Sequence, residues 1–272
     1  MNSISNLTRG ASYPAVTKSD VEQVGIPVPS IETQRRIVAV LEQIQEIRRR
    51  RIEANQFTSK VIQSVFLKMF GDPEANERGW ATRPLGDMTK ISRRIVKPKE
   101  EHQDLLHVGG ENIESVTGRL INLRTIKEDG IRSVNFLISP RDILYCKIRP
   151  NLRKVAMPDF EGLCSADIYP LTPAQGVTRE FLCHLLRSDV FTKYASAVST
   201  SRANIPKINR TELENYVTIC PPLSEQHRFS QIAQLASHLT EIQEASLEEI
   251  NELFQSLMQK AFRGELRELT ET

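Results

Sequence analysis

The sequence predicts an α+β protein, with one mixed α/β domain and two long helices packed as an antiparallel coiled coil. Three observations predict this fold. Residues 14–70 and 206–262 form an internal repeat. Each copy contains a long apolar pattern of helical period that no Pro or Gly interrupts. Between the copies, short β-like runs alternate with Pro and Gly turns, which is typical of a compact sheet domain.

The repeat aligns without a gap at a constant offset of 192 positions. Pro29 then meets Pro221, and Gln34 meets Gln226. The segment "VTKSDVE" meets "INRTELE", and "QSVFLKMF" meets "QSLMQKAF". Matches in register over this length indicate one structural unit used twice.

Each copy predicts a helix that begins after a Pro-containing turn. Ser30 is placed to cap the first helix, and Glu32 and Glu225 lie in the favourable first turns. The apolar stripes follow coiled-coil spacing and read Ile37, Val40, Ile44, Ile47, Ala54, Val61 and Val65 in the first copy, and Phe229, Ile232, Ala236, Leu239, Ile250, Leu253 and Leu257 in the second. We expect the two stripes to face each other. The alternative is two unrelated amphipathic helices, each on its own core.

The chain between the helices predicts strands in "LLHVGG", "VNFLIS", "DILYCKI", "RKVAMP" and "CSADIYPLTP". One helical patch, "TREFLCHLLRSDVFTKYASAV", interrupts them, and Phe181, Leu182, Leu185 and Leu186 form its predicted buried face. This mixture is typical of a compact α+β domain.

Composition excludes several classes of protein. The 272 residues are 26% charged and 39% apolar with a net charge of +2, which is too small by itself to indicate a nucleic-acid partner. The four cysteines form no CxxC pair, so we expect buried or half-buried free thiols. No apolar run approaches the ~18 residues of a membrane span, and residues 1–14 lack the layout of a signal peptide. We therefore expect a cytoplasmic protein with no membrane partner.

Motifs for catalysis, cofactors and metals do not appear in the sequence. It contains no P-loop, no GxGxxG and no HExxH. His184 falls on the helical patch, where a partly buried histidine is a more common explanation than a metal ligand. The sequence therefore predicts a protein that is not an enzyme and that uses no cofactor or metal.

Clusters of basic residues indicate binding instead. In "KIRPNLRK" a Pro-Asn turn brings the cations together, which suits contact with phosphates and with guanine. The segment "STSRANIPKINR" adds small polar residues and an asparagine able to pair with adenine. The candidate DNA-binding residues from these two segments are Lys147, Arg149, Asn151, Arg153, Lys154, Ser199, Arg202, Asn204 and Lys207. Solvated charged loops, or a domain hinge at the second segment, are the alternatives.

A run of four arginines, residues 48–51, lies in the middle of the first predicted helix. Four consecutive residues point all around a helix, so at least one of them should lie near the partner stripe. The others form either a solvated face or a contact with acidic protein or DNA.

Several motifs together resemble the specificity (S) subunit of type I restriction–modification systems, in the form of a C-terminal half-subunit. They are "GWATRPLGDM", "HVGGENI", "DILYCKIRPNLRKVA", "GLCSADIYPLTP" and the closing "PPLSEQHRF" with "LMQKAFRGEL". The resemblance covers nearly the whole chain. It implies a target recognition domain that reads one half of a bipartite DNA sequence, and conserved helices that dock the modification (methyltransferase) subunits. Restriction subunits join through the complex, and Asn112 in "GGENI" is implied to lie near the DNA.

The resemblance also implies four segments. Residues 1–27 are the remnant tail of a first recognition domain, residues 28–71 the first spacer helix, residues 72–220 the target recognition domain and residues 221–272 the second spacer helix. The body of the first domain is not in the sequence, so we expect residues 1–25 to be disordered or to pair with a neighbouring molecule. A homodimer, or pairing with another half-subunit, would restore binding to double-stranded DNA through two domains. The alternative function is a truncated adaptor or decoy that binds the methyltransferase subunit without reading DNA.

Overall fold

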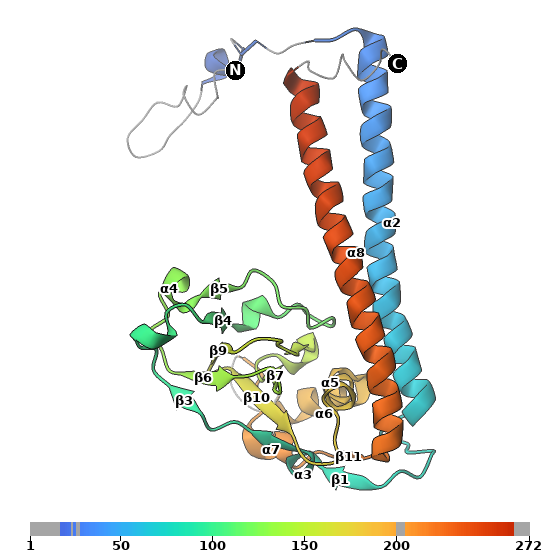
Figure 1. Ribbon diagram of the computed structural model, residues 1–272, viewed down its shortest axis with the longest axis vertical. Coiled ribbons are helices and arrows are strands. Elements are labelled where there is room, and N and C mark those ends of the chain that lie inside the picture. Colours follow the sequence, from blue (N-terminus) through green and yellow to red (C-terminus); the bar gives the residue numbers. More distant parts are fainter. Residues whose placement is uncertain (1–16, 23, 26–27, 200–204, 264–272) are drawn as a thin grey trace. The chain divides into compact units, whose positions relative to one another are not determined.

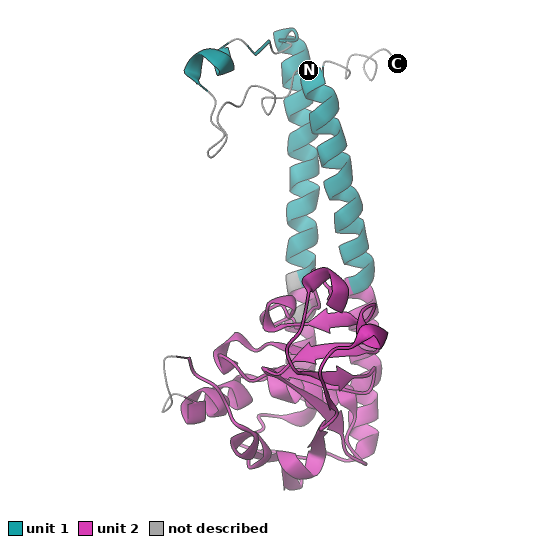
Figure 2. Ribbon diagram, turned by 90° about the vertical axis from the view of Figure 1, so that its left-hand side faces the viewer, with its two compact units in different colours: residues 1–55, 241–272 teal, residues 56–240 magenta. Residues whose placement is uncertain are grey.

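The structure is a computed structural model of the chain, and it describes residues 17–22, 24–25, 28–199 and 205–263. Two compact units make up the chain: unit 1 holds residues 1–55 and 241–272, and unit 2 holds residues 56–240 (Figure 2). The division falls inside both long helices. The limits of the four predicted segments therefore stay a prediction.

The two long helices are α2, Ile31–Phe70, and α8, Leu223–Arg263 (Figure 1). They begin at positions that the repeat makes equivalent, 31 and 223. Ser30 caps α2 as predicted, because its hydroxyl accepts a hydrogen bond from the backbone N–H of Thr33 at 3.3 Å. The repeat also extends to one side-chain bond: Gln34 donates to the carbonyl of Pro29 at 2.9 Å, and Gln226 donates to that of Pro221 at 2.8 Å.

The helices pack against each other antiparallel, as predicted. In unit 2 the ring of Phe229 on α8 lies 5.4 Å from that of Phe66 and 5.5 Å from that of Phe70 on α2. In unit 1 the guanidinium of Arg48 lies over the ring of Phe254, 5.4 Å from its centroid. Along the contact, residue numbers on α8 fall as those on α2 rise, so the two helices run in opposite directions.

The predicted seam between the helices is wrong in part. Ile44 and Phe229 are buried, but six predicted stripe residues are 39% to 51% exposed: Val40, Ile47, Val61, Ile232, Leu239 and Leu253. The seam of unit 1 instead includes buried polar atoms of Arg48, Gln243 and Asn251. Each helix carries apolar residues on more than one side. The side that faces the partner helix also accepts long side chains such as Arg48, whose stem is apolar. An apolar stripe alone therefore does not identify the side that is packed.

Unit 2 contains the predicted strands, arranged in three sheets. The pairing orders are β1-β11, β2-β10-β7-β8 and β3-β6-β9-β4-β5, and β4 with β9 is the parallel pair among the described strands. The strands are β1 Thr82–Pro84, β2 Thr89–Ile91, β3 Ile95–Val96, β4 Leu106–Val108, β5 Arg124–Thr125, β6 Asn135–Ile138, β7 Ile143–Cys146, β8 Val155–Ala156, β9 Gly162–Ser165, β10 Ile168–Pro173 and β11 Val217–Ile219. The segment predicted as one strand in "CSADIYPLTP" is divided between β9 and β10.

Short helices connect these strands. They are α3 Leu85–Met88, α4 Ile126–Asp129, α5 Arg179–Arg187, α6 Asp189–Ser199 and α7 Arg210–Glu214, with 3-10 turns η2 Glu100–His102, η3 Gly110–Asn112 and η4 Pro150–Leu152. The single predicted helical patch is two helices, α5 and α6. Ser188 separates them, and its hydroxyl accepts the N–H of Phe191 at 3.2 Å. The predicted buried face is confirmed, because its four residues are at most 1% exposed.

The core of unit 2 joins the ends of the long helices to the sheets. Phe66, Phe70 and Phe229 from the helices pack with Phe181 of α5 in one cluster. A second cluster, with Val108 and Ile168 among its members, fills the space between the two larger sheets. All four cysteines are buried free thiols. Within the described part of the chain, no helix has the length and apolarity needed to cross a bilayer.

The repeat also includes the short helix before each long one. The short helices are α1, Lys18–Glu22, and α7. Thr17 and Asp20 bond to each other at the start of α1, and Asn209 and Glu212 do the same at the start of α7, at the equivalent positions. Most of residues 1–25 lie outside the described residues. The expectation that they are disordered or pair with a neighbouring molecule therefore concerns residues that the structure does not describe.

Candidate nucleic-acid interface

The loop of residues 147–154 connects β7 to β8 and contains the first predicted set of cations. Its centre is the 3-10 turn η4, flanked by Arg149 at φ 50° and Arg153 at φ 52°, both in the left-handed region. Two backbone bonds close the turn, from Leu152 N–H to Arg149 O at 2.9 Å and from Arg153 N–H to Pro150 O at 3.0 Å. The loop therefore has a defined backbone shape.

The second predicted segment lies directly beside this loop. Arg149 N–H donates to Pro206 O at 2.8 Å, Ile208 N–H donates to Lys147 O at 3.1 Å, and Ile148 forms an isolated β-bridge with Lys207. Two segments about sixty residues apart in the sequence thus form one surface. Predicted residues Arg202 and Asn204 lie outside the described residues, so their position is not part of this surface.

Three of the predicted cations bind atoms of the protein itself. Lys147 donates to Ala166 O at 2.6 Å and lies over the ring of Tyr169. Lys154 donates to Gly110 O at 2.5 Å, and Arg153 pairs with Asp189 at 2.5 Å. These contacts fix the loop to neighbouring elements. The partners of Lys147 and Lys154 could not be read from the sequence, because Gly110 and Ala166 contribute only main-chain oxygens.

The side chains of Arg149, Asn151 and Lys207 are exposed, and we call these three residues the reading surface. No ion pair or hydrogen bond to these side chains is present among the described residues. Asn112 and Ser199 differ from them. The Asn112 amide accepts Gly109 N–H and donates to Ile121 O and Asn122 O, and the fully buried Ser199 hydroxyl bonds to Ala195 O. Neither side chain offers a polar group toward solvent.

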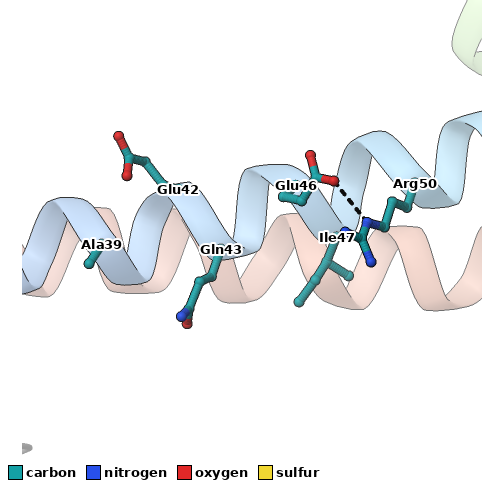
Figure 3. A pocket seen from close by; sticks show the side chains of 6 residues that line it. All are labelled: Ala39, Glu42, Gln43, Glu46, Ile47 and Arg50. Carbon is teal, nitrogen blue, oxygen red and sulfur yellow. Dashed lines mark hydrogen bonds and ion pairs between the residues drawn. The ribbon is translucent and has the colours of Figure 1, made fainter.

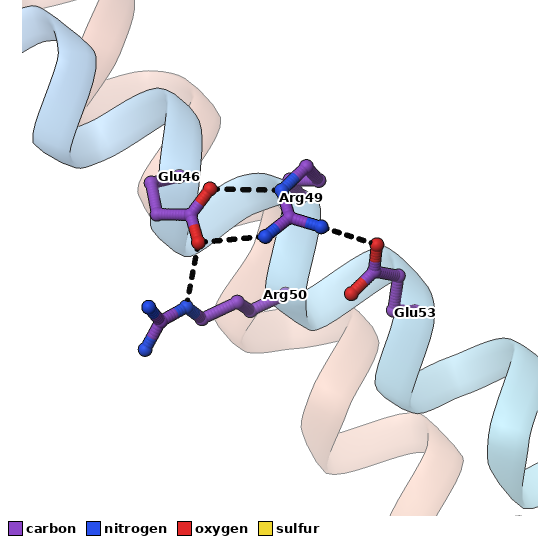
Figure 4. A network of polar contacts seen from close by, with 4 residues as sticks. All are labelled: Glu46, Arg49, Arg50 and Glu53. Carbon is purple, nitrogen blue, oxygen red and sulfur yellow. Dashed lines mark hydrogen bonds and ion pairs between the residues drawn. The ribbon is translucent and has the colours of Figure 1, made fainter.

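Two of the four arginines in the run on α2, Arg49 and Arg50, pair with glutamates of the same helix (Figure 4). Arg49 bonds both Glu46 and Glu53, and Arg50 bonds Glu46 at 2.8 Å. The hydrogen bonds from Arg49 and Arg50 lower the pKa of Glu46 to about 2. A hollow of about 570 Å³ lies beside this network, lined by Ala39, Glu42, Gln43, Glu46, Ile47 and Arg50 (Figure 3). All six lining residues come from α2, which makes this a surface feature of unit 1.

Exposed apolar residues mark a second candidate surface in unit 2. Ile232, Leu235 and Leu239 follow one side of α8 and are 39%, 72% and 47% exposed, and Phe57 and Val61 on α2 are 68% and 40% exposed. We call these five residues the outer apolar face. Exposed apolar residues repeated along a helix are typical of a protein-docking surface.

A pocket of about 420 Å³ lies between α2 and the α5–α6 connection of unit 2. His184 lines it together with residues such as Phe66 and Arg153, and its ring packs edge-on against that of Phe229 at 5.2 Å. Burial, with a smaller contribution from the charge of Arg187, lowers the pKa of His184 from 6.5 to about 3. His184 is therefore neutral in the folded protein at neutral pH. Among the described residues, no group of three or more His, Cys, Asp or Glu side chains is arranged to hold a metal ion.

The lowered pKa of His184 predicts loss of stability in acid. The unfolded chain binds a proton near pH 6.5 and the folded chain does not, so the contribution is complete above pH 6.5 and is lost as the pH falls toward 3. Between pH 7.5 and pH 5 the free energy of unfolding should fall by about 2 kcal/mol from this group. Urea unfolding at both pH values measures it. The variant His184→Gln should lose this dependence, while His227→Gln, at an exposed position on α8, should keep it.

Comparison with known proteins identifies the family. The family model for the type I restriction modification DNA specificity domain matches residues 1–56 and 77–252. The specificity subunit of the type I restriction enzyme EcoDI from Escherichia coli is 29% identical over 296 residues, covering 95% of this chain and 66% of that protein. The StySPI specificity subunit from Salmonella potsdam is 23% identical and covers 97% of this chain and 62% of that protein.

Solved structures agree with this family. A chain from a structure on complex assembly and conformational transition of the type I R-M system matches with a TM-score of 0.55 and 26% identity, over 94% of this chain and 65% of that chain. The type I restriction–modification S subunit from M. genitalium has a TM-score of 0.59 over 94% of this chain and 68% of its own, and its 13% identity shows the fold alone. The chain spans just under two thirds of the length of the curated relatives named above. Since the family model matches most of the chain, the chain belongs to the family of type I restriction–modification DNA specificity domains.

Proposed function

We propose that the chain recognises DNA within a type I restriction–modification complex, and that unit 2 binds one half of a bipartite target through the reading surface. The observation that carries this proposal is the shaped basic loop, which holds Arg149 and Asn151 beside Lys207 and leaves all three exposed. Lysine suits phosphate contact, and arginine and asparagine suit base edges in the major groove. In this proposal the chain is not an enzyme, and other subunits supply methyl transfer and cleavage.

The outer apolar face supports docking of a methyltransferase subunit on the helices. Phe57 and Leu235 are about 70% exposed, which is unusual for large apolar side chains without a partner. A restriction subunit would then join through the complex rather than through this chain. The paired arginines 49 and 50 are less suited to such a contact, because Glu46 and Glu53 already neutralise them.

The internal repeat supports a second recognition domain at the beginning of α2. Gln226 is fully buried, and it binds Thr178 N–H at 2.9 Å and Gly176 O at 3.1 Å in the sheet domain. Its repeat equivalent Gln34 keeps the bond to Pro29 but is only half-buried. A second copy of the chain, or another half-subunit, would bring a domain to this position.

Binding to duplex DNA should depend strongly on salt. If two to four phosphates are contacted, the logarithm of the binding constant should fall with the logarithm of salt concentration at a slope of about −2 to −4. Fluorescence anisotropy with a randomised duplex pool, with and without methyltransferase subunits, measures this slope. Co-expression with those subunits and genome-wide mapping of methylated bases would then give the target.

The opposite result would be methyltransferase binding without salt-dependent binding of duplex DNA. That result would favour the adaptor function and would contradict DNA recognition by this chain. A single-stranded pool of the same composition serves as the control for contacts that depend on charge alone.

A further inference from the structure

We infer that Arg149 reads a guanine base, and that Lys147, Arg153 and Lys154 are positioning residues that hold the loop. This inference rests on the proposed function. It divides the basic loop into two kinds of residue that the sequence does not distinguish.

The loop holds Arg149 in a backbone conformation that costs free energy. Non-glycine residues seldom adopt positive φ, and here two arginines on either side of η4 do so. Such conformations persist where the surrounding structure determines them, and they are frequent at binding sites. The positive φ angles of Arg149 and Arg153 therefore favour a functional role for this turn.

Contacts on several sides of the turn determine its shape. Arg149 N–H is held by Pro206 O, and Leu152 O accepts the N–H of Val116 at 3.3 Å. Lys154 and Arg153 anchor the far end of the loop through Gly110 O and Asp189. Each contact comes from a different part of unit 2, so the backbone at Arg149, and with it the direction in which its side chain leaves the chain, is held by the protein.

Three of the four cations of the loop already bind other groups of the protein. Lys147 is only 14% exposed at its side chain and Arg153 only 26%, and both have charged partners. Within the described chain, Arg149 alone among the four has an exposed side chain without a hydrogen bond or an ion pair. A cation that is paired within the protein contributes little to DNA binding, so we assign base recognition to Arg149.

The guanidinium of Arg149 fits a base better than a phosphate. A planar guanidinium on a fixed backbone can donate two parallel hydrogen bonds to O6 and N7 of guanine, and a lysine at the same place cannot reproduce them. A phosphate would accept hydrogen bonds from either residue. Lys207 lies next to the loop as a flexible point charge suited to that second role.

The test compares four variants of the full chain. Arg149→Gly removes the side chain, and glycine adopts positive φ at no steric cost, so its melting temperature should equal or exceed that of the wild type. Arg149→Lys keeps the charge. Lys154→Met removes one positioning contact. Arg141→Ala is the matched control, because Arg141 is an exposed arginine near the opposite end of β7.

Base preference is measured by sequencing the duplexes that each variant selects from a randomised pool at fixed salt. Arg149→Gly and Arg149→Lys should both lose about 10- to 100-fold preference for one guanine, and Arg149→Lys should keep the wild-type salt slope. Lys154→Met should lower the melting temperature and the affinity for all sequences together. Arg141→Ala should keep the wild-type profile.

Two results would overturn the inference and separate it from the proposed function. If the wild type selects a sequence and Arg149→Lys selects the same one with equal strength, Arg149 contacts a phosphate and the inference alone fails. If the wild type shows no salt-dependent binding to duplex DNA, the proposed function fails and the inference fails with it.

Discussion

Replacing Phe229 with alanine should lower the free energy of unfolding by about 3–5 kcal/mol. The Phe229 side chain is fully buried on α8, and its ring contacts those of Phe66 and Phe70 on α2 and of His184 on α5. The substitution therefore opens a cavity where three helices of unit 2 meet. Urea unfolding of the full chain, followed by far-UV circular dichroism, measures the loss.

Phe57→Ala is the matched control for this experiment. Phe57 is also a phenylalanine on a long helix, but it is 68% exposed, so its removal should change the free energy of unfolding by less than about 0.5 kcal/mol. Equal losses for Phe229→Ala and Phe57→Ala would contradict the packing described for unit 2. They would mean that Phe57 is buried in solution, for example by a second molecule on the outer apolar face.

Replacing Gln226 with alanine should lower the free energy of unfolding by about 2–4 kcal/mol, because it leaves buried groups unsatisfied. The Gln226 amide bonds the N–H of Thr178 and the carbonyls of Gly176 and Pro221. Thr178 caps α5, since its hydroxyl accepts Phe181 N–H at 3.4 Å. Loss of Gln226 therefore weakens the contact between α8 and the sheet domain. Thermal and urea unfolding of the full chain measure it.

Gln34→Ala provides the comparison within the same chain. Gln34 occupies the equivalent place in the repeat, but among the described residues its side chain makes one hydrogen bond, to Pro29 O, from a half-buried position. Its replacement should cost about 0.5–1 kcal/mol. A loss as large as that of Gln226→Ala in the isolated chain would show that a domain already covers Gln34. That outcome would count against an open position at the beginning of α2.

Sequence reasoning predicted the helices well because their signals are local. The repeat places Ile31 and Leu223 at equivalent positions, and both begin a helix. The turn before each helix and the absence of Pro and Gly within it are properties of neighbouring residues. The seam was less predictable, because Arg48 lies inside over Phe254 while Ile47 lies half outside. Which side of a helix faces a partner depends on the partner.

In the candidate site, too, features with a local sequence signal were predictable and contacts between distant residues were not. The basic segments and their turn were visible in the sequence, and the structure brings residues 147–154 beside Lys207. The internal partners of the cations were not visible, since Lys154 bonds Gly110 across 44 positions and Lys147 bonds Ala166 across 19. Asn112 was implied to lie near DNA from its motif alone. Its amide is bonded to the main chain at three positions, and a motif does not reveal that.

Two of the positioning cations bind main-chain oxygens, which has a consequence for how this protein can evolve. Every amino acid supplies a carbonyl, so substitutions at Gly110 or Ala166 need not remove the oxygens that receive Lys154 and Lys147. The side chains at positions 149, 151 and 207 are exposed, and the contacts that the fold requires there are made by the backbone. Under the proposed function, new target sequences can therefore arise by substitution at a few exposed positions while the supporting loop stays intact.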